Sequence, residues 1–305
     1  MEVHPEYLIN EDRLLEELKD SLFENLKSCT LCPHECKIDR LSNKTGICGA
    51  PLNPVIASYA VHMGEEPPIS GVSGSGTIFF SYCTLKCIYC QNYPISQLRN
   101  GTSKSSEELS KMMLYLQERG CHNINLVTPT HFLPHILDAI LISKRKGLHI
   151  PIVYNTSGWE KIEIVKALKF FVDIYLPDAR YSNDKVAFEF SKAKNYTEIN
   201  GNALIEMRKN QPEDIFNKEG FMLKGLIIRV LILPGYSSDT IETIKRIKES
   251  LGNNVYISLM SQYYPCYKAL NHETLGRKIT YEEYLAVKNY MEKLGFEYGW
   301  IQEYE

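Results

Sequence analysis

Three cysteines lie close together at Cys83, Cys87 and Cys90, directly after an apolar run over residues 76–81. Their spacing is C-x3-C-x2-C, so three thiolates on one tight loop can converge on a single iron-sulfur cluster, which cysteine sulfur binds. A cubane with three protein ligands leaves one iron open to a reacting molecule. A zinc knuckle is the alternative, but structural zinc takes four ligands and no fourth partner follows nearby. The motif therefore predicts a reactive [4Fe-4S] cluster.

A second set of cysteines stands nearer the N-terminus, at Cys29, Cys32, Cys36 and Cys48. The pattern C-x2-C-x3-C-x11-C supplies four thiolates, which suit structural zinc and a closed iron-sulfur cluster equally well. His34 lies inside the pattern and can stand in for one of them. We therefore expect a second metal site, either zinc or iron-sulfur; four uncoordinated thiols are the alternative.

Length and charge define the broad class of the chain. Its 305 residues suggest roughly two domains of about 150 residues each. The 34 Lys and Arg residues against 37 Asp and Glu residues create no strong field toward nucleic acid or an anionic membrane. No run approaches the roughly 20 apolar residues of a spanning helix. We therefore predict a cytoplasmic protein without nucleic-acid or membrane partners, in which reduced cysteines bind metal.

Residues 1–70 are predicted to form an N-terminal unit that contains a helix, the four-cysteine metal module and a linker. The helix is expected over residues 11–27, with one apolar face made of Leu14, Leu15, Leu18, Leu22 and Leu26. Residues 51–75 are rich in proline, glycine and serine, and the paired prolines favour extended chain. His62, Glu65 and Glu66 are expected to be solvated in this linker, although a site position is the alternative.

Residues 71–305 alternate short β-branched or aromatic runs with amphipathic helical patterns. Six strands are predicted, at residues 77–81, 123–127, 152–155, 172–176, 226–233 and 255–259. The helices between them include residues 133–145, 160–170 and 239–251, and a mostly helical insert extends to about residue 210. Capping boxes begin helices after Ser105 and Thr280. Repeated strand-helix units imply a parallel sheet, so we predict an α/β fold, a partial (βα)6 TIM-like barrel.

Polar residues follow the predicted strands, at the end where parallel barrels build their sites. The candidates for cofactor binding are Thr128, Thr130, Asn155, Ser157, Asp178, Arg229 and Gln262. Asparagine and serine can bond a ribose, and arginine can clamp a carboxylate. For Asp178 or Arg229 alone, a structural ion pair is an equal alternative. Cys121 and Cys266 are better interpreted as buried apolar residues than as catalysts, and the role of Cys266 stays open.

The chain resembles the uncharacterised iron-sulfur relatives of pyruvate formate-lyase activating enzymes, which use radical S-adenosylmethionine (SAM) chemistry. The resemblance rests on the three-cysteine motif with Tyr89 before its last cysteine, and on residues 29–36, 64–68, 74–80, 90–93, 125–131, 176–178 and 257–265. It implies a barrel of the radical SAM type, a [4Fe-4S] cluster at Cys83, Cys87 and Cys90, and SAM as cosubstrate. Tyr89 is then expected beside the cofactors.

The resemblance also implies a reaction. The reduced cluster would cleave SAM to methionine and a 5′-deoxyadenosyl radical, which abstracts a substrate hydrogen. The implied partners are a glycyl-radical enzyme or another protein or peptide substrate, and a reductant of the flavodoxin or ferredoxin type. The alternatives are radical chemistry on a different peptide or a small molecule, and a non-catalytic iron-sulfur electron-transfer protein.

Departures from the activating-enzyme pattern limit what the resemblance implies. Activating enzymes carry Gly-Gly-Glu after the second strand, and its acidic residue helps hold the SAM amine, whereas this chain has Thr128-Pro-Thr130. Relatives usually have glycine just before the first cluster cysteine, where this chain has Tyr82. The simplest activating enzymes lack the four-cysteine module. The resemblance therefore defines the cofactor chemistry better than the substrate.

Overall fold

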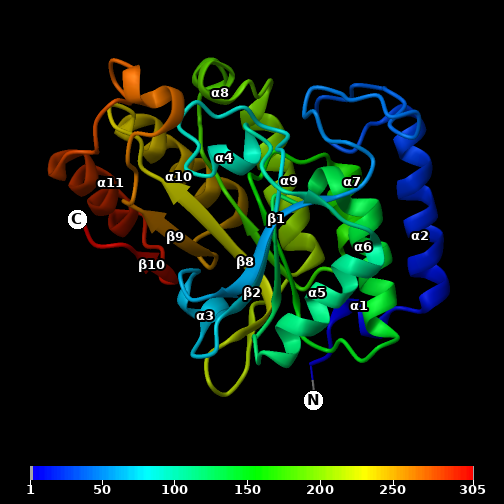
Figure 1. The fold of residues 1–305 in the computed structure, drawn as a ribbon. Helices are drawn as coiled ribbons and strands as arrows, with labels where there is room; N and C mark the ends of the chain where they lie inside the picture. The colour runs from blue at the N-terminus through cyan, green and yellow to red at the C-terminus, as the bar shows by residue number, and fades with distance from the viewer. Residues whose placement is uncertain (1–2, 305) are drawn as a thin grey trace.

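A computed structural model describes residues 3–304, and its centre is a single curved sheet (Figure 1). The strands follow the order β10-β9-β8-β6-β5-β4-β2-β1-β3. A parallel series in sequence order begins with the six predicted strands, which are β2 (Ser75–Phe80), β4 (Ile124–Val127), β5 (Ile152–Thr156), β6 (Ile174–Pro177), β8 (Met222–Leu231) and β9 (Tyr256–Met260). A short seventh strand, β10, continues the series beyond β9. The predicted (βα)6 arrangement is confirmed.

Helices cover the outer face of this sheet (Figure 1). They are α5 (Ser106–Glu118), α6 (Leu133–Lys144), α7 (Ile162–Leu168), α8 (Asp184–Ser191), α9 (Tyr196–Asn210), α10 (Ser237–Leu251) and α11 (Tyr281–Lys293). Both predicted capping boxes are present, because Ser105 and Thr280 accept from the backbone of the third helical residue, whose glutamate accepts in return. Within residues 3–304 no helix is both long and apolar enough to cross a membrane.

The two ends of the sheet leave the barrel open. At one end β1 (Val55–His62) is antiparallel to β2 and also pairs with β3 (Thr102–Ser103). At the other end β10 (Gly299–Ile301) is parallel to β9, and β7 (Ile215–Phe216) pairs with β8 off the main path. Among the described residues no strand pairing joins β10 to β1 or β3. The barrel is therefore partial, with a lateral opening between its first and last strands.

The predicted linker over residues 51–75 is wrong. It contains β1 and the one-turn helix α3 (Pro67–Ser70). Pro67 starts that helix because the first helical position needs no backbone N–H donor, so paired prolines were compatible with a helix here. A domain boundary at residue 70 stays a prediction, and it separates β1 from β2, the strand with which β1 pairs.

The N-terminal helix packs on the outside of the barrel. It runs as α1 (Glu6–Ile9), α2 (Asp12–Asn25) and η1 (Leu26–Ser28), and α2 lies along α6 (Figure 1). Leu15, Leu22 and Leu26 are buried as predicted. Leu14 is 38% exposed, so its place on the buried face was wrong. Short helices α4 (Tyr93–Ser96), η2 (Thr130–Phe132) and η3 (Tyr267–Asn271) complete the loops.

The interior of the barrel is apolar toward one end and polar toward the other. An apolar cluster fills the end near α3, and it consists of Ile69, Val153, Ile174, Leu176, Met222 and Ile227. Further along the same strands, toward their carboxyl ends, stand Asn155 on β5 and Arg229 on β8. Side chains two residues apart on a strand share a face, so Val153 and Asn155 both point inward. The polar end therefore has a closed apolar base beneath it.

Gly158, two residues after β5, lies where the loops after β5 and β6 approach each other closely. Its φ is +71°, and a Cβ there would press on the carbonyl oxygen of Asp178. Asn200 of α9 donates to the carbonyls of Gly158 and Asp178, at 3.0 Å each, and holds the two loops together. We expect Gly158→Ala to lower the free energy of unfolding by the cost of a positive φ, about 1–3 kcal/mol, plus about 1–3 kcal/mol of overpacking.

The matched control is Gly120→Ala. Gly120 also has a positive φ, +83°, but nothing lies within 4 Å of its added Cβ. Urea unfolding of both variants separates the clash from the backbone strain. Equal losses in the two variants would contradict the close approach of the loops.

Candidate active site

The cysteine loop follows β2 and faces a small cavity at the carboxyl ends of the strands. Cys83, Cys87 and Cys90 all line this cavity, which has a volume of about 100 Å³. Several other predicted site residues line it as well: Thr128, Asn155, Ser157, Asp178 and Arg229. Residues separated by almost 150 positions in the chain thus meet at one place because each follows or ends a parallel strand.

Hydrogen-bond donors surround the three sulfur atoms. Cys87 Sγ accepts from Arg180 Nη1 at 3.1 Å and from Ser191 Oγ at 3.0 Å. Cys83 Sγ accepts from the backbone N–H of Leu85 at 3.3 Å. Such donors orient ligand thiolates and stabilise their negative charge.

The donor set fits a multi-iron cluster. Burial, together with the neighbouring Cys87 and Cys90, raises the pKa of Cys83 to about 12. Burial and Cys87 likewise raise the pKa of Cys90 to about 11. These thiols need a bound cation to become thiolates. Within residues 3–304 no three Cys, His, Asp or Glu side chains converge tightly enough to hold a single metal ion. The three cysteines line one shared cavity, as the predicted cluster requires.

Asp178 sits between two arginines at the side of the cavity. It accepts from Arg229 Nε at 2.9 Å and from Arg180 Nη2 at 2.5 Å, and its side chain is 10% exposed. Burial alone would raise the pKa of Asp178, but Arg229 and Arg180 hold that pKa below its usual value. Arg229 Nη2 also donates to Asn155 Oδ1 at 2.6 Å. Asp178 and Arg229 therefore form a structural ion pair, and both also face the cavity.

Tyr89 is linked to the cluster loop through hydroxyl groups. Its OH lies 2.5 Å from the OH of Tyr181, which lies 2.6 Å from Ser191 Oγ. Ser191 in turn donates to Cys87. The Tyr89 ring lines a second, larger cavity beside the first. Its hydroxyl is thus committed to a hydrogen-bonded chain that ends on a cysteine sulfur.

Two residues occupy backbone positions that favour glycine. Tyr82, just before Cys83, has φ +68°, and Thr128 has φ +58°. These are the places where the activating-enzyme pattern has glycine. Tyr82 is held by an edge contact with Phe132 and by Arg99 above its ring. The chain therefore keeps the glycine-like bend of both loops without glycine, at a cost of about 1–3 kcal/mol each.

Thr130 is turned away from the cavity. It is 2% exposed and donates to Glu160 Oε1 at 2.7 Å, and its hydroxyl also lies 2.9 Å from the hydroxyl of Tyr154. Thr156 donates to the same carboxyl oxygen of Glu160. The structure thus places Thr130 in a buried network that fixes the loops behind the site, and it lines neither cavity.

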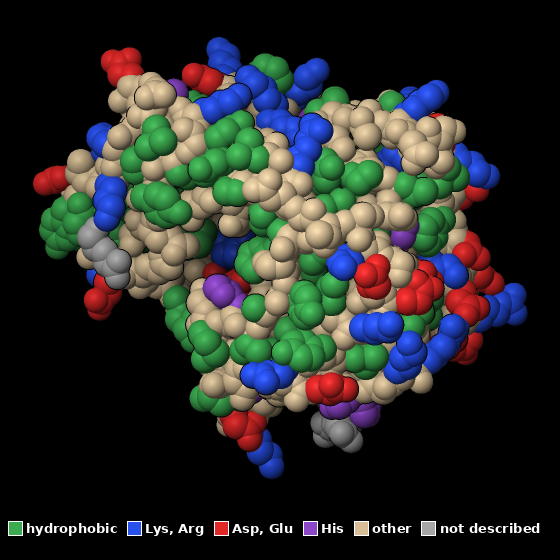
Figure 2. Space-filling view, viewed as in Figure 1, with side chains coloured by type: hydrophobic (Ala, Val, Ile, Leu, Met, Phe, Trp, Pro, Cys, Tyr) green, Lys and Arg blue, Asp and Glu red, His purple; other side chains and the backbone are tan. Residues whose placement is uncertain are grey.

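The second cavity has a volume of about 470 Å³ and shares Cys90, Asn155, Asp178, Arg180 and Arg229 with the first. It reaches the surface as a hollow with basic, acidic and histidine side chains in and around it (Figure 2). Gln262 lines it, as do His62 and Glu65. The side chain of Glu65 is 9% exposed, so the expectation that it is solvated was wrong. The pKa of Glu65 is raised above its usual value, and burial is the main cause.

The four-cysteine module packs directly against the cluster loop. His34 Nε2 donates to the carbonyl of Thr84 at 2.7 Å. Lys86 Nζ donates to the carbonyls of Cys48 and Cys83, at 3.3 Å each. His34 therefore joins the two cysteine segments through Nε2, and its possible role in place of a thiol stays a prediction.

The four thiols of the module are neighbours. Burial raises the pKa of Cys32, and the nearby Cys48, Cys29 and Cys36 add to this rise. Cys36 Sγ accepts from the backbone N–H of Ile47 at 3.4 Å. A metal at this module stays a prediction.

The remaining two cysteines lie outside both sets. Cys266 is 8% exposed, and its thiol donates to the carbonyl of Tyr89 at 3.3 Å, behind the cluster loop. Cys121 is 3% exposed and packs in the main core. Both are buried, as the sequence predicted.

Arg180 and Ser191 were not among the predicted site residues, and a site position for Glu65 was only the alternative to a solvated one. Arg180 had a usable signal, because it stands two residues after Asp178 at a strand end. Ser191 ends a helix of the insert, and nothing local in the sequence points to Cys87. Glu65 lies in a proline-rich segment, which the sequence pattern predicted to be a solvated linker.

The fold and the three cysteines define a class of protein. Residues 77–210, from β2 to the end of α9, match the model of the radical SAM superfamily. The superfamily implies a [4Fe-4S] cluster and SAM. Streptococcus suis SuiB bound to S-adenosylmethionine shares the fold, with a TM-score of 0.50 and 13% identity over 72% of this chain. The aligned part covers 48% of SuiB, so this chain spans about half the length of that structure.

Two further matches are a second structure of SuiB and an uncharacterized protein. SuiB bound to its precursor peptide SuiA has a TM-score of 0.49 and 13% identity, over 72% of this chain and 46% of that chain. The uncharacterized protein MJ0674 of Methanocaldococcus jannaschii is 29% identical over 279 residues, which are 88% of this chain and 75% of the relative. Similarity to MJ0674 extends beyond residues 77–210, and the name of MJ0674 assigns no reaction.

The buried Glu160 predicts a dependence of stability on pH. Burial raises its pKa to about 7, against an ordinary value of 4.5. Between these values the folded chain keeps a proton that the unfolded chain has lost, so stability falls as the pH rises through this window. Glu160→Gln cannot ionise. From pH 4.5 to pH 7 we therefore expect the variant to gain up to about 3 kcal/mol in free energy of unfolding relative to the wild type.

Urea unfolding at pH 5 and pH 8 measures this difference. Asp173 also has its pKa raised by burial, but it is present in both proteins and cancels in the comparison. Glu163→Gln, at an exposed position of α7, is the matched control and should not change with pH in this way. A constant difference between Glu160→Gln and the wild type at both pH values would rule out a buried, protonated Glu160.

Proposed function

We propose that the protein is a radical SAM enzyme, which generates a 5′-deoxyadenosyl radical and abstracts a hydrogen from its substrate. Cys83, Cys87 and Cys90 would hold the [4Fe-4S] cluster. When bound together, the cluster and SAM supply one-electron reductive cleavage of the sulfonium. The observation that supports this proposal most is that the three thiols and the polar strand-end residues Asn155 and Arg229 line one cavity.

The residues of the chain would have distinct tasks in this reaction. Arg180 and Ser191 donate to Cys87 and hold its sulfur in one position. Arg229, fixed by Asp178, retains further N–H groups on a guanidinium with five donors, and one of them can bind the carboxylate of SAM. Ser157 and Asn155 are placed for the ribose. The larger cavity, which shares its wall with the first, would receive the substrate.

The substrate and partners are proposed from the sequence resemblance. A glycyl-radical enzyme is the first choice, because the matching segments resemble relatives of activating enzymes along most of the chain. Another peptide or a small molecule is the alternative. The electron would come from a flavodoxin or ferredoxin, and the location would be the cytoplasm. The four-cysteine module would hold zinc or a second iron-sulfur cluster.

SAM cleavage tests the proposed reaction. We expect the anaerobically reconstituted, dithionite-reduced wild type to convert SAM to 5′-deoxyadenosine, and Cys87→Ala to lose this turnover because an open-iron cluster needs all three thiolates. Cys121→Ala is the matched control, since Cys121 is buried outside both cysteine sets. Chromatography of the products measures the yield. No turnover by a fully reconstituted wild type would favour a non-catalytic electron-transfer protein instead.

Removing one thiol of the N-terminal module tests whether the two cysteine sets are separate sites. We expect Cys32→Ala to lose one metal site and keep the cluster that responds to SAM, because four thiolates saturate a metal centre while three leave an iron free. Metal and sulfide analysis, with electron paramagnetic resonance in the presence of SAM, measures both. If Cys32→Ala loses the SAM-dependent signal while Cys87→Ala keeps it, the two assignments are reversed.

A further inference from the structure

The carboxylate of Glu65 lies in the larger cavity with weak compensation of its charge. Its nearest cation is Arg229, and the distance from Arg229 Nη1 to Glu65 Oε2 is 3.6 Å, which exceeds hydrogen-bond length. Arg229 is meanwhile committed to Asp178 and Asn155 at 2.9 and 2.6 Å. A buried carboxylate with free acceptor positions is unfavourable unless a donor fills them.

Asp178 differs from Glu65 in this respect. Arg180 and Arg229 together give it three charge-assisted hydrogen bonds, so its acceptor positions are largely filled. Among the described residues, the arginines and carboxylates that line the larger cavity are Arg180, Arg229, Asp178 and Glu65. A third carboxylate, Glu66, is close enough to affect the pKa values of both Arg229 and Glu65. With Glu66 counted, three carboxylates stand against two arginines, and His62 is a further lining side chain that can carry a positive charge.

Unpartnered polar atoms around Glu65 indicate a place where a hydrogen-bonding ligand can bind. Asn125 is completely buried, and neither polar atom of its amide has a partner at good hydrogen-bond geometry among the described residues, but the amide lies close enough to Glu65 to lower the pKa of that carboxyl. It stands two residues before Val127 on β4, and Val127 lines the cavity, so both side chains face the interior. Glu66 is 9% exposed, and its Oε2 also has no partner there. One donor group placed here would serve several of these atoms.

The acceptors around Glu65 suit an organic cation better than a metal ion. Within residues 3–304 the acidic and histidine side chains do not form a group of three that could hold a metal, and His62, Glu65 and Glu66 are included in that statement. A primary ammonium has three N–H donors and a guanidinium has five, which suits acceptors that lie apart.

The ammonium group of SAM is a competing source of the charge. The cavity that the three cysteines line does not include Glu65 or His62, whereas Asn155, Ser157 and Arg229 do line it. SAM held at the open iron would place its amine and carboxylate beside the cysteines. Glu65 faces the remainder of the larger cavity, so a second molecule is the better match.

We propose that Glu65, with Asn125 beside it, binds an ammonium or guanidinium group of the substrate. This inference rests on the proposed function, because it takes the larger cavity as the substrate site. The substrate class is then a peptide with lysine or arginine next to the reacting residue, or a small amine. The cationic group would fix the position of the substrate relative to SAM.

Binding of n-butylammonium to the reconstituted full-length protein tests the proposal without using turnover. We expect ligand-observed NMR at constant ionic strength to show binding to the wild type and at least tenfold weaker binding to Glu65→Gln. Neutral n-butanol should bind both proteins equally. Glu65→Asp keeps the charge and should retain most of the binding, which separates loss of charge from loss of fold.

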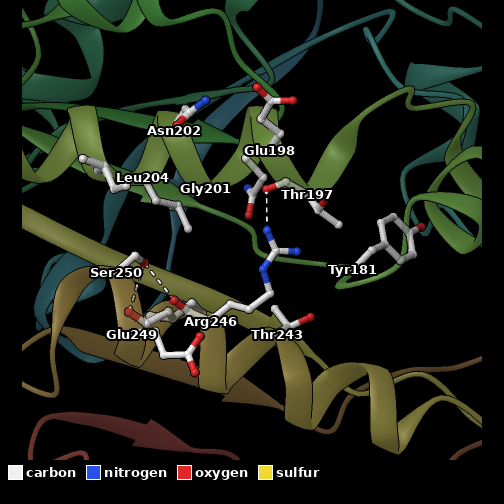
Figure 3. A pocket seen from close by; sticks show the side chains of 13 residues that line it. Tyr181, Thr197, Glu198, Gly201, Asn202, Leu204, Thr243, Arg246, Glu249 and Ser250 are labelled. Carbon is white, nitrogen blue, oxygen red and sulfur yellow. Dashed lines mark hydrogen bonds between the residues drawn. The ribbon is translucent and has the colours of Figure 1, made fainter.

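A matched control lies in a cavity of about 340 Å³ between α9 and α10 (Figure 3). Glu249 lines it, and Arg246 spans it to donate to the carbonyl of Thr197 at 3.0 Å. Glu249→Gln should leave n-butylammonium binding unchanged.

Two results would overturn the proposal. One is that n-butylammonium fails to bind the wild type or binds Glu65→Gln equally well. The other is that Glu65→Gln weakens SAM affinity tenfold, measured by equilibrium dialysis, since this would assign the ammonium to SAM. Failure of the radical SAM reaction itself would appear separately, as a wild type that produces no 5′-deoxyadenosine.

Discussion

The ion pair at Asp178 is the interaction on which the site depends. One carboxylate binds two arginines, and each arginine continues to another functional group, Arg180 to Cys87 and Arg229 to Asn155. Breaking a buried pair by removing one partner typically costs about 3–5 kcal/mol, because the other charge is left uncompensated. The loops after β2 and β6 and the strands β5 and β8 are thus held in one arrangement by charge, and the sulfur of Cys87 is part of it.

The cluster loop is supported from two further sides. From outside, His34 of the N-terminal module donates to the carbonyl of Thr84 in the loop, and Lys86 of the loop donates to the carbonyl of Cys48 in the module. From inside, Tyr82 and Thr128 keep positive φ angles that glycine would adopt at lower cost. Backbone strain of this kind persists only where the surroundings over-determine the conformation. The aromatic contacts of Tyr82 and the closeness of the module provide that support.

The open barrel separates two tasks within one interior. Toward the carboxyl ends of the strands, thiols and polar groups line a small cavity suited to a cluster. Toward the lateral opening, a larger cavity contains Glu65, whose charge is only partly compensated. Because Asp178 and Arg229 belong to both walls, a ligand in one cavity acts on the same network as a ligand in the other. That shared wall is a physical route by which a ligand in one cavity can influence a ligand in the other.

The sequence by itself determined the local features. Alternating strand and helix patterns predicted six parallel strands, the capping boxes marked two helix starts, and cysteine spacing indicated the cluster loop. Each of these depends on residues a few positions apart. The tertiary structure alone decided that Ser191 donates to Cys87, that Glu65 is buried beside Arg229, and that Thr130 turns away from the cavity. Those outcomes depend on contacts between distant segments, which leave no periodic signal in the chain. The antiparallel strand β1 was missed for the same reason, because its pairing with β2 overrode the proline-rich composition around it.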